Sequence, residues 1–136
     1  MSNDHLPALP LAANGMGIPN GDFIVVEWQD PGSPPGPPSY IAPIHVHHED
    51  DEAWYVLEGT LCVLCGDAVI EARAGAGVFV PKGTRHTYWN PSPEPLRYLL
   101  IMTPRIHQLI EAIHEMTDRT PEKMKALFAK FRSELL

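Results

Sequence analysis

Four residues with metal-ligand side chains, His45, His47, Glu52 and His86, constrain this chain more than any other feature of its sequence. His45 and His47 are two residues apart, so on a β-strand their side chains point to the same face. Glu52 begins a run of strand-forming residues, and His86 lies in a second such run at 84–89. Three neighbouring strands of one barrel can therefore direct three imidazoles and one carboxylate to a common point. Imidazole and carboxylate together suit first-row divalent metals, so we predict one metal site.

The spacing around these residues follows two short motifs. The first motif contains His45, His47, Glu52 and Gly59, and the second contains Gly75, Pro81, Gly83, His86 and Asn90. In the spacing of the fixed residues of both motifs, the chain resembles the cupins. The cupin motifs are written G-x5-H-x-H-x(3,4)-E-x6-G and G-x5-P-x-G-x2-H-x3-N. The one departure is Ser39, which stands where the first motif opens with glycine. That position makes a turn and binds nothing, so the departure leaves the predicted metal site intact.

The resemblance implies an all-β fold, the cupin double-stranded β-helix or jelly-roll barrel. It also implies that His45, His47, Glu52 and His86 bind one divalent transition metal, because they match the ligands of the family. Iron, manganese, nickel, copper and zinc all stay open as the metal. His48 is one residue beyond the ligand pair, so we expect it to face the opposite side as a solvated surface histidine.

The residues outside the motifs agree with a barrel. Short strand-forming runs separated by turn residues extend from residue 22 to residue 102, which is typical of an all-β barrel. In the tail, residues 103–136, apolar residues recur at helical spacing and form two stripes. Each stripe starts at a Thr-Pro pair. We therefore predict an N-terminal arm at 1–21, a cupin β-barrel domain at 22–102 and a C-terminal extension of two α-helices at 103–136.

The charge distribution argues against some partners. The 136 residues carry a formal net charge of −7, and residues 1–102 hold twelve Asp and Glu against four Lys and Arg. An acidic body repels phosphate backbones, so we expect no nucleic acid partner. No apolar run is long enough to span a membrane, and residues 1–14 lack the pattern of a secretory signal. We expect no membrane partner and a cytoplasmic location.

Two further features each allow a structural and a functional interpretation. Residues 30–38 hold five prolines, so they form a loop, which is either a solvated connector or a semi-rigid lip beside a pocket. Cys62 and Cys65 have a C-x-x-C spacing, which can indicate redox or zinc chemistry. Residues three apart on a strand face opposite sides, so we predict two reduced, half-buried thiols without either role.

Alternation along the ligand strands predicts the walls of a substrate pocket. Trp54 and Val56 share a face with Glu52, and Tyr88 shares a face with His86, so these three should line an apolar pocket with one phenolic hydroxyl. One hypothesis is a metal-dependent dioxygenase, similar to the small quercetin-dioxygenase-like cupins, that acts on a small enolic or phenolic substrate. Glu52 would then be both ligand and catalytic proton acceptor. The alternatives are a non-catalytic cupin that binds a small molecule, and a metal-dependent isomerase or lyase.

The sequence also favours self-association. The run Thr60 to Cys65 is apolar at nearly every position, so both of its faces require burial. The two tail helices carry more apolar surface than isolated solvated helices tolerate. The resemblance to cupins, among which dimers are common, and the frequency of two-fold dimers in general point the same way. We predict a homodimer, and leave open whether the helices cover their own barrel or a partner subunit.

Overall fold

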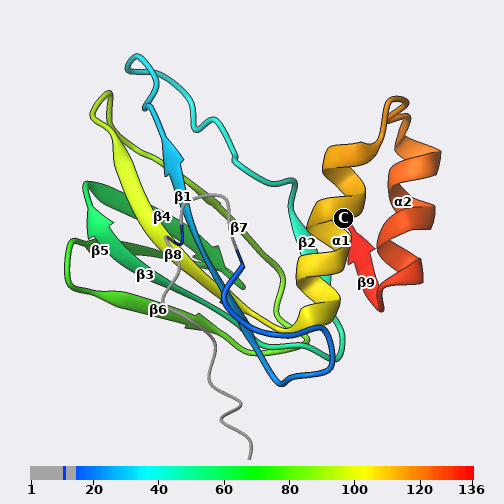
Figure 1. The fold of residues 1–136 in the computed structure, drawn as a ribbon. Coiled ribbons are helices and arrows are strands. Elements are labelled where there is room, and N and C mark those ends of the chain that lie inside the picture. The colour runs from blue at the N-terminus through cyan, green and yellow to red at the C-terminus, as the bar shows by residue number, and fades with distance from the viewer. Residues whose placement is uncertain (1–10, 12–14) are drawn as a thin grey trace, which may run out of the picture.

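Two facing antiparallel β-sheets form the body of the protein. The computed structural model describes residue 11 and residues 15–136. The strands are β1 Ile24–Asp30, β2 His45–His47, β3 Glu52–Glu58, β4 Thr60–Cys65, β5 Ala68–Arg73, β6 Gly77–Val80, β7 His86–Trp89, β8 Leu96–Met102 and β9 Ser133–Leu135. One sheet has the order β1-β8-β3-β6 and the other β5-β4-β7-β2-β9 (Figure 1). The predicted all-β jelly-roll barrel is confirmed.

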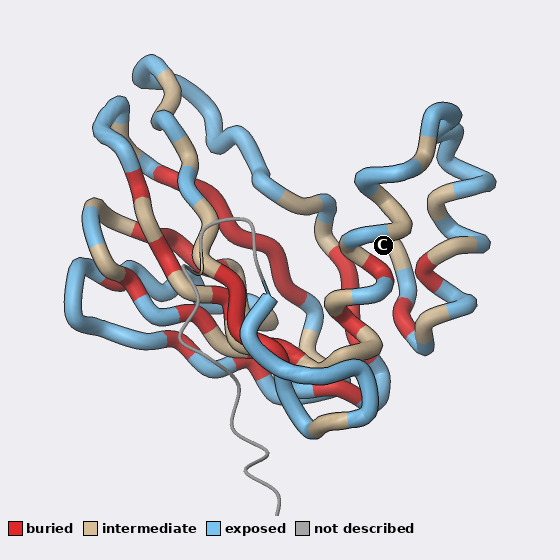
Figure 2. Tube along the Cα trace, viewed as in Figure 1, coloured by how far each residue is buried: buried red, intermediate tan, exposed pale blue. Residues whose placement is uncertain are grey.

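Alternation along the strands places the core between the two sheets. In β3, Trp54 and Val56 are buried, whereas Tyr55 between them is 40% exposed. The same period in β8 buries Leu96, Tyr98, Leu100 and Met102. Figure 2 shows the buried residues as red stretches along the strands of the barrel. The inward side chains form one hydrophobic cluster with β4, β6 and β7, so the ligand strands are anchored in a packed interior.

The glycine that closes the first motif is required by a turn. Gly59 joins β3 to β4 with φ at +84°, a region in which side chains are strained. A Cβ at this position would also meet the backbone carbonyl of Pro95. The turn therefore needs glycine for its conformation and for the close approach of the neighbouring loop.

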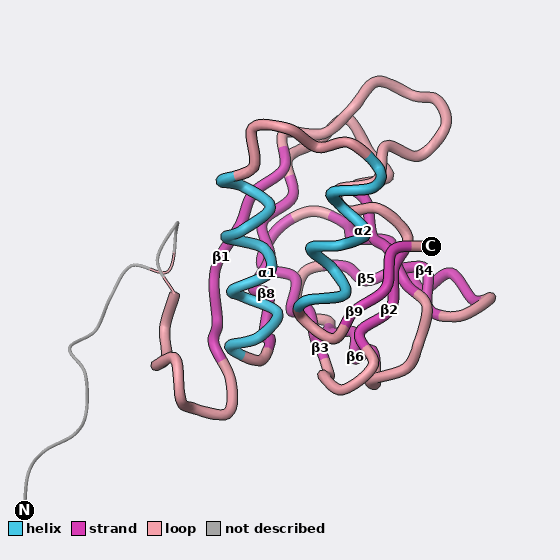
Figure 3. Tube along the Cα trace, turned by 90° about the vertical axis from the view of Figure 1, so that its right-hand side faces the viewer, coloured by secondary structure: helices cyan, strands magenta, loops and turns pink. Residues whose placement is uncertain are grey.

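Both predicted helices are present and begin at the predicted Thr-Pro pairs. They are α1, Pro104–Glu115, and α2, Pro121–Lys130. The Thr103 and Thr120 hydroxyls accept hydrogen bonds from the backbone N–H three residues later, at 3.3 and 3.4 Å. Figure 3 shows the two helices side by side in front of the barrel. The helices contact each other, α1 also packs on β8 and α2 on β9, so within the chain they cover their own barrel.

The chain end adds a strand that the sequence did not indicate. After α2, Arg132 turns the backbone with φ at +57°, and β9 then pairs antiparallel with β2. In this register Leu135 lies opposite His45 and Ser133 lies opposite His47. The extension was predicted to contain helices alone; its last residues instead complete the sheet beside two of the predicted metal ligands.

The remaining predicted segments are only partly described. Most of the predicted arm, 1–21, lies outside the described residues. Met16 exchanges two backbone hydrogen bonds with Val25, so the described end of the arm runs beside β1.

The thiols of Cys62 and Cys65 are free, and only Cys65 packs against the hydrophobic cluster.

None of the helices among the described residues is long and apolar enough to cross a membrane. The homodimer stays a prediction. The outer surface of the barrel exposes two large apolar side chains, Phe79 by 60% and Phe23 by 58%.

Candidate metal centre

The four predicted ligands meet at one buried point. One potential ligand atom from each of His45, His47, Glu52 and His86 lies within 4.8 Å of the others, and each residue is at most 5% exposed. His45 and His86 are direct cross-strand partners on β2 and β7. Glu52, however, comes from β3 in the opposite sheet. The prediction of three neighbouring strands is therefore wrong in detail: the carboxylate faces the histidines across the barrel, because the jelly roll folds β3 onto the second sheet.

Each imidazole is held by a hydrogen bond at its Nδ1 atom. His45 Nδ1 donates to the Pro43 carbonyl at 2.6 Å, and His86 Nδ1 donates to the Thr84 carbonyl at 2.9 Å. A carbonyl can only accept, so both rings carry a proton on Nδ1 and turn Nε2 toward the centre. The Nε2 atoms of His45 and His47 lie 3.1 Å apart. Such outer bonds are the usual way in which proteins orient histidine ligands.

The third ring depends on the C-terminal strand. His47 Nδ1 lies 2.6 Å from the hydroxyl oxygen of Ser133 in β9. That hydroxyl lies 3.2 Å from the Phe131 carbonyl and donates its proton there. Ser133 therefore accepts from His47, and this bond presents His47 Nε2 to the centre in the same way as the other two rings.

The charges at the centre suit a cation. Burial alone raises the pKa of Glu52, but hydrogen bonds from His47 and His86 outweigh that effect and lower the pKa to about 2. Glu52 is thus a carboxylate at neutral pH. His86 Nε2 lies 2.9 Å from Glu52 Oε1, and this bond raises the pKa of His86 against the opposing effect of its burial. A metal bound here would replace the proton that His86 shares with Glu52.

His45 contributes a neutral ring. Burial lowers its pKa to about 4, with further lowering from His86 and His47. A neutral imidazole has the free lone pair that metal coordination requires. Three converging Nε2 atoms and one carboxylate therefore form a donor set that fits a divalent first-row metal.

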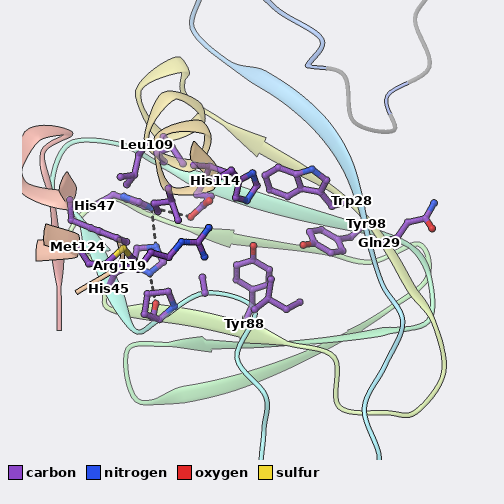
Figure 4. A pocket seen from close by; sticks show the side chains of 18 residues that line it. Trp28, Gln29, His45, His47, Tyr88, Tyr98, Leu109, His114, Arg119 and Met124 are labelled. Atoms are coloured by element: carbon purple, nitrogen blue, oxygen red, sulfur yellow. Dashed lines mark hydrogen bonds and ion pairs between the residues drawn. The ribbon is translucent and has the colours of Figure 1, made fainter. Parts of the chain in front are cut away.

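A cavity of about 360 Å³ opens beside the ligands (Figure 4). Its walls come from β1, β7, β8, the 41–43 segment and both helices, and they are mostly apolar. The lining residues are Trp28, Gln29, Ile41, Ala42, Pro43, His45, His47, Glu52, Tyr88, Tyr98, Ile106, Leu109, Ile110, Ile113, His114, Arg119, Met124 and Phe128. The prolines of the 30–38 loop are not among them, which favours a connector over a lip.

The predicted pocket residues divide into two groups. Tyr88 lines the cavity, as the sequence predicted. Trp54 and Val56 face inward but are 1% and 0% exposed in the hydrophobic core, and neither is among the lining residues. Trp54 packs against His86 and Tyr88, with ring centroids 5.9 and 5.2 Å apart, so it supports the site from behind. The cavity opens toward the helices, and the barrel interior beyond the ligands is filled.

Two tyrosines, Tyr88 and Tyr98, place phenolic hydroxyls in the cavity wall. Burial raises the pKa of Tyr98 to about 12, and burial together with Tyr98 raises the pKa of Tyr88 well above its ordinary value. Both hydroxyls therefore keep their protons at neutral pH and can donate to an oxygen of a bound molecule.

Outside the cavity, His48 is half-exposed and lies 3.3 Å from Glu134, as expected for a surface histidine.

Removing the Ser133 hydroxyl should weaken metal binding without unfolding the barrel. We expect Ser133→Ala to reduce the affinity for Zn²⁺ by about tenfold, because His47 loses the bond that orients it. Ser39→Ala, in an exposed loop, is the matched control and should bind as the unmodified chain does. Competition with a chromophoric chelator measures both, and equal affinities in the three proteins would contradict this role of Ser133.

The metal-free protein should lose stability as pH falls from 7 to 5. The folded pKa of His45, about 4, lies below its ordinary value of 6.5, so in this range the unfolded chain binds a proton that the folded chain does not. His45 therefore costs about 2 kcal/mol of unfolding free energy at pH 5 relative to pH 7. The raised pKa of His86 acts in the opposite direction and offsets part of this loss.

The variant His45→Asn isolates the contribution of this ring. We expect its urea-unfolding free energy, measured with a chelator present, to fall less between pH 7 and pH 5 than that of the unmodified chain. His48→Asn, which changes an exposed ring, should keep the original pH dependence. A His45→Asn profile parallel to the unmodified one would refute the assignment.

Comparison with known proteins agrees with this geometry. Residues 36–102 match the family model described as a cupin domain. A cupin protein from Bacteroides fragilis is 17% identical, covers 76% of this chain and 86% of its own, and superimposes with a TM-score of 0.59. A candidate sugar phosphate isomerase from Acidithiobacillus ferrooxidans is 25% identical over 61% of this chain and 51% of its own, with a TM-score of 0.51.

One curated relative also matches. A mannose-1-phosphate guanylyltransferase from Salmonella muenchen is 31% identical over 64 residues, which are 47% of this chain and 13% of that protein. The chain thus spans a small part of the length of this relative. Residues 36–102 thus match the cupin family model, and the two motifs and the two-sheet barrel agree with that match.

Proposed function

We propose that this protein is a metal-dependent cupin enzyme, a dioxygenase that acts on a small, largely apolar enolic or phenolic substrate. The observation that carries the proposal is the position of the four ligands, which are buried at the wall of an apolar cavity large enough for a small molecule. A site that served only to stiffen the barrel would not need such a cavity beside it.

The ligand set leaves room for chemistry. Four protein ligands leave coordination positions of a first-row metal for water, dioxygen or a substrate oxygen, and the bound metal would supply Lewis acidity and, for iron, manganese, nickel or copper, redox activity. The chain itself contributes the apolar helices, whose Leu109 and Phe128 are buried at the cavity and help to exclude water. Tyr88 and Tyr98 offer protonated hydroxyls that can orient a substrate oxygen.

The catalytic role of Glu52 remains a prediction. Its low pKa suits a permanent ligand better than a proton acceptor, because a base works best with a pKa near the working pH. The proton that Glu52 shares with His86 is the one feature that connects it to proton transfer.

A metal-dependent isomerase is the second candidate. It is supported by the likeness to the candidate sugar phosphate isomerase from Acidithiobacillus ferrooxidans. A sugar phosphate presents hydroxyl groups along its whole length, whereas this cavity is walled chiefly by Ile, Leu, Met, Phe and Trp side chains. Hydroxyls buried against such walls would lose hydrogen bonds to water, so the lining favours a less polar substrate.

Replacing a ligand should remove the metal. We expect His47→Ala to lose most of the metal that the unmodified protein retains, since three ligands hold the ion more weakly than four. His48→Ala is the matched control, because His48 faces solvent one residue away. Elemental analysis of protein purified from its native host gives the content and the identity of the metal. Equal content in all three proteins would exclude this site.

Oxygen consumption then separates the candidate activities. We expect protein loaded with iron, manganese, nickel or copper to consume oxygen with at least one member of a panel of enolic and phenolic compounds, and zinc-loaded protein to consume none. His47→Ala should be inactive with the same compound. A native metal that is zinc alone, with no oxygen consumption under any metal, would instead support isomerase chemistry or simple binding.

A further inference from the structure

We infer that the molecule bound in this cavity carries a carboxylate that pairs with Arg119, at the end away from the oxygen that meets the metal. The inference rests on the proposed function and narrows its substrate class. The substrate would have an enol or phenol oxygen at one end, an apolar middle and a carboxylate at the other end.

Arg119 belongs to the same cavity as the ligands. It lies in the connection 116–120 between α1 and α2, and among the described residues that line the cavity it is the only Lys or Arg. In the view of Figure 4 its side chain extends from the helical side between the histidines and Tyr88. A permanent positive charge therefore borders a cavity whose other walls are mostly apolar.

Arg119 has no acidic partner among the described residues. Four other arginines, Arg85, Arg97, Arg105 and Arg132, each have a carboxylate oxygen within 3.1 Å. The acid nearest to Arg119 in sequence, Asp118, is already paired with Lys123 at 2.7 Å and accepts from the Thr120 N–H. Four of the six arginines thus have a carboxylate partner, whereas Arg73 and Arg119 have none among the described residues, and of these two Arg119 lines the cavity.

The connection that carries Arg119 is held at both ends. The Met116 N–H bonds to the Ile113 carbonyl where α1 ends, and the Thr120 hydroxyl caps the start of α2. Only three residues, 117–119, lie between these two anchors, so the backbone of Arg119 is kept at the rim of the cavity. A guanidinium in such a place binds a carboxylate through two parallel hydrogen bonds, which distinguishes it from a diffuse positive surface.

Charge complementarity favours an anion here in spite of the acidic protein. The net charge of the whole chain is −7, which repels anions at long range. Within the cavity a divalent metal with the Glu52 carboxylate leaves one positive charge, and Arg119 adds a second. Arg119 is an exposed residue at the mouth of the cavity, so its guanidinium can meet a ligand carboxylate without having its own charge buried first.

Matched probes test this assignment in the zinc-loaded protein. Dihydrocaffeate carries a catechol that can meet the metal and a carboxylate on a short chain, and its primary amide is the neutral equivalent. Protocatechuate and its amide form a second, shorter pair, so that two distances from the metal are sampled. Titration calorimetry should show that one acid at least binds about tenfold more tightly than its amide.

Two variants with the same change in charge locate the effect. Arg119→Gln should lose the preference for the acid and bind the amide within about twofold of the unmodified protein. Arg73→Gln, on β5 and not among the cavity residues, should keep the full preference. All three proteins should bind equal amounts of zinc, because a guanidinium offers no lone pair to a metal and the four candidate ligands are unchanged.

The outcomes separate this inference from the proposed function. If zinc binds but no acid is preferred, or if Arg119→Gln keeps the preference, the role of Arg119 is wrong and the metal centre stands. If the preference is lost equally in Arg73→Gln, the effect is one of overall charge and the assignment is also wrong. If the unmodified protein binds no zinc, the proposed function fails, and the inference that rests on it fails too.

Discussion

The hydrogen bonds at the three Nδ1 atoms are the interaction on which this site depends. Burying three imidazoles and a carboxylate is costly unless every polar atom has a partner. Two of the rings use backbone carbonyls two residues earlier in the chain, at Pro43 and Thr84. The local chain that carries each ligand therefore also orients it, and the three Nε2 atoms converge before any metal is present.

The third ring shows that the barrel and the C-terminal extension form one structural unit. His47 takes its partner from Ser133, at the far end of the sequence. That serine reaches the site only because α1 and α2 cross the mouth of the barrel and return the chain to β2. The same path brings Leu109 and Phe128 to the cavity. Orientation of one candidate metal ligand and closure of the cavity thus depend on the same segment.

The ligands could be predicted from sequence because their signal is local. Two histidines on one strand face, a glutamate and a third histidine at fixed spacing define the set without knowledge of the rest of the fold. The amphipathic tail helices and their threonine caps were equally local and were confirmed. The sequence alone did not show that Glu52 faces the histidines from the opposite sheet, since this depends on how the two sheets pack.

The parts that sequence did not reveal depend on long-range docking. β9 has three residues, too few for alternation to indicate a strand, and it is recognisable only beside β2. The cavity walls combine Trp28 of β1 with Met124 of α2, which are remote in sequence and share no motif. Trp54 and Val56 share the inward face of Glu52, but alternation cannot tell a cavity wall from filled core. The barrel thus supplies the four candidate metal ligands, while the helices and their connection supply much of the cavity wall. Changes at the helix residues of this wall can alter the cavity without disturbing the ligands only where β9 keeps Ser133 beside His47.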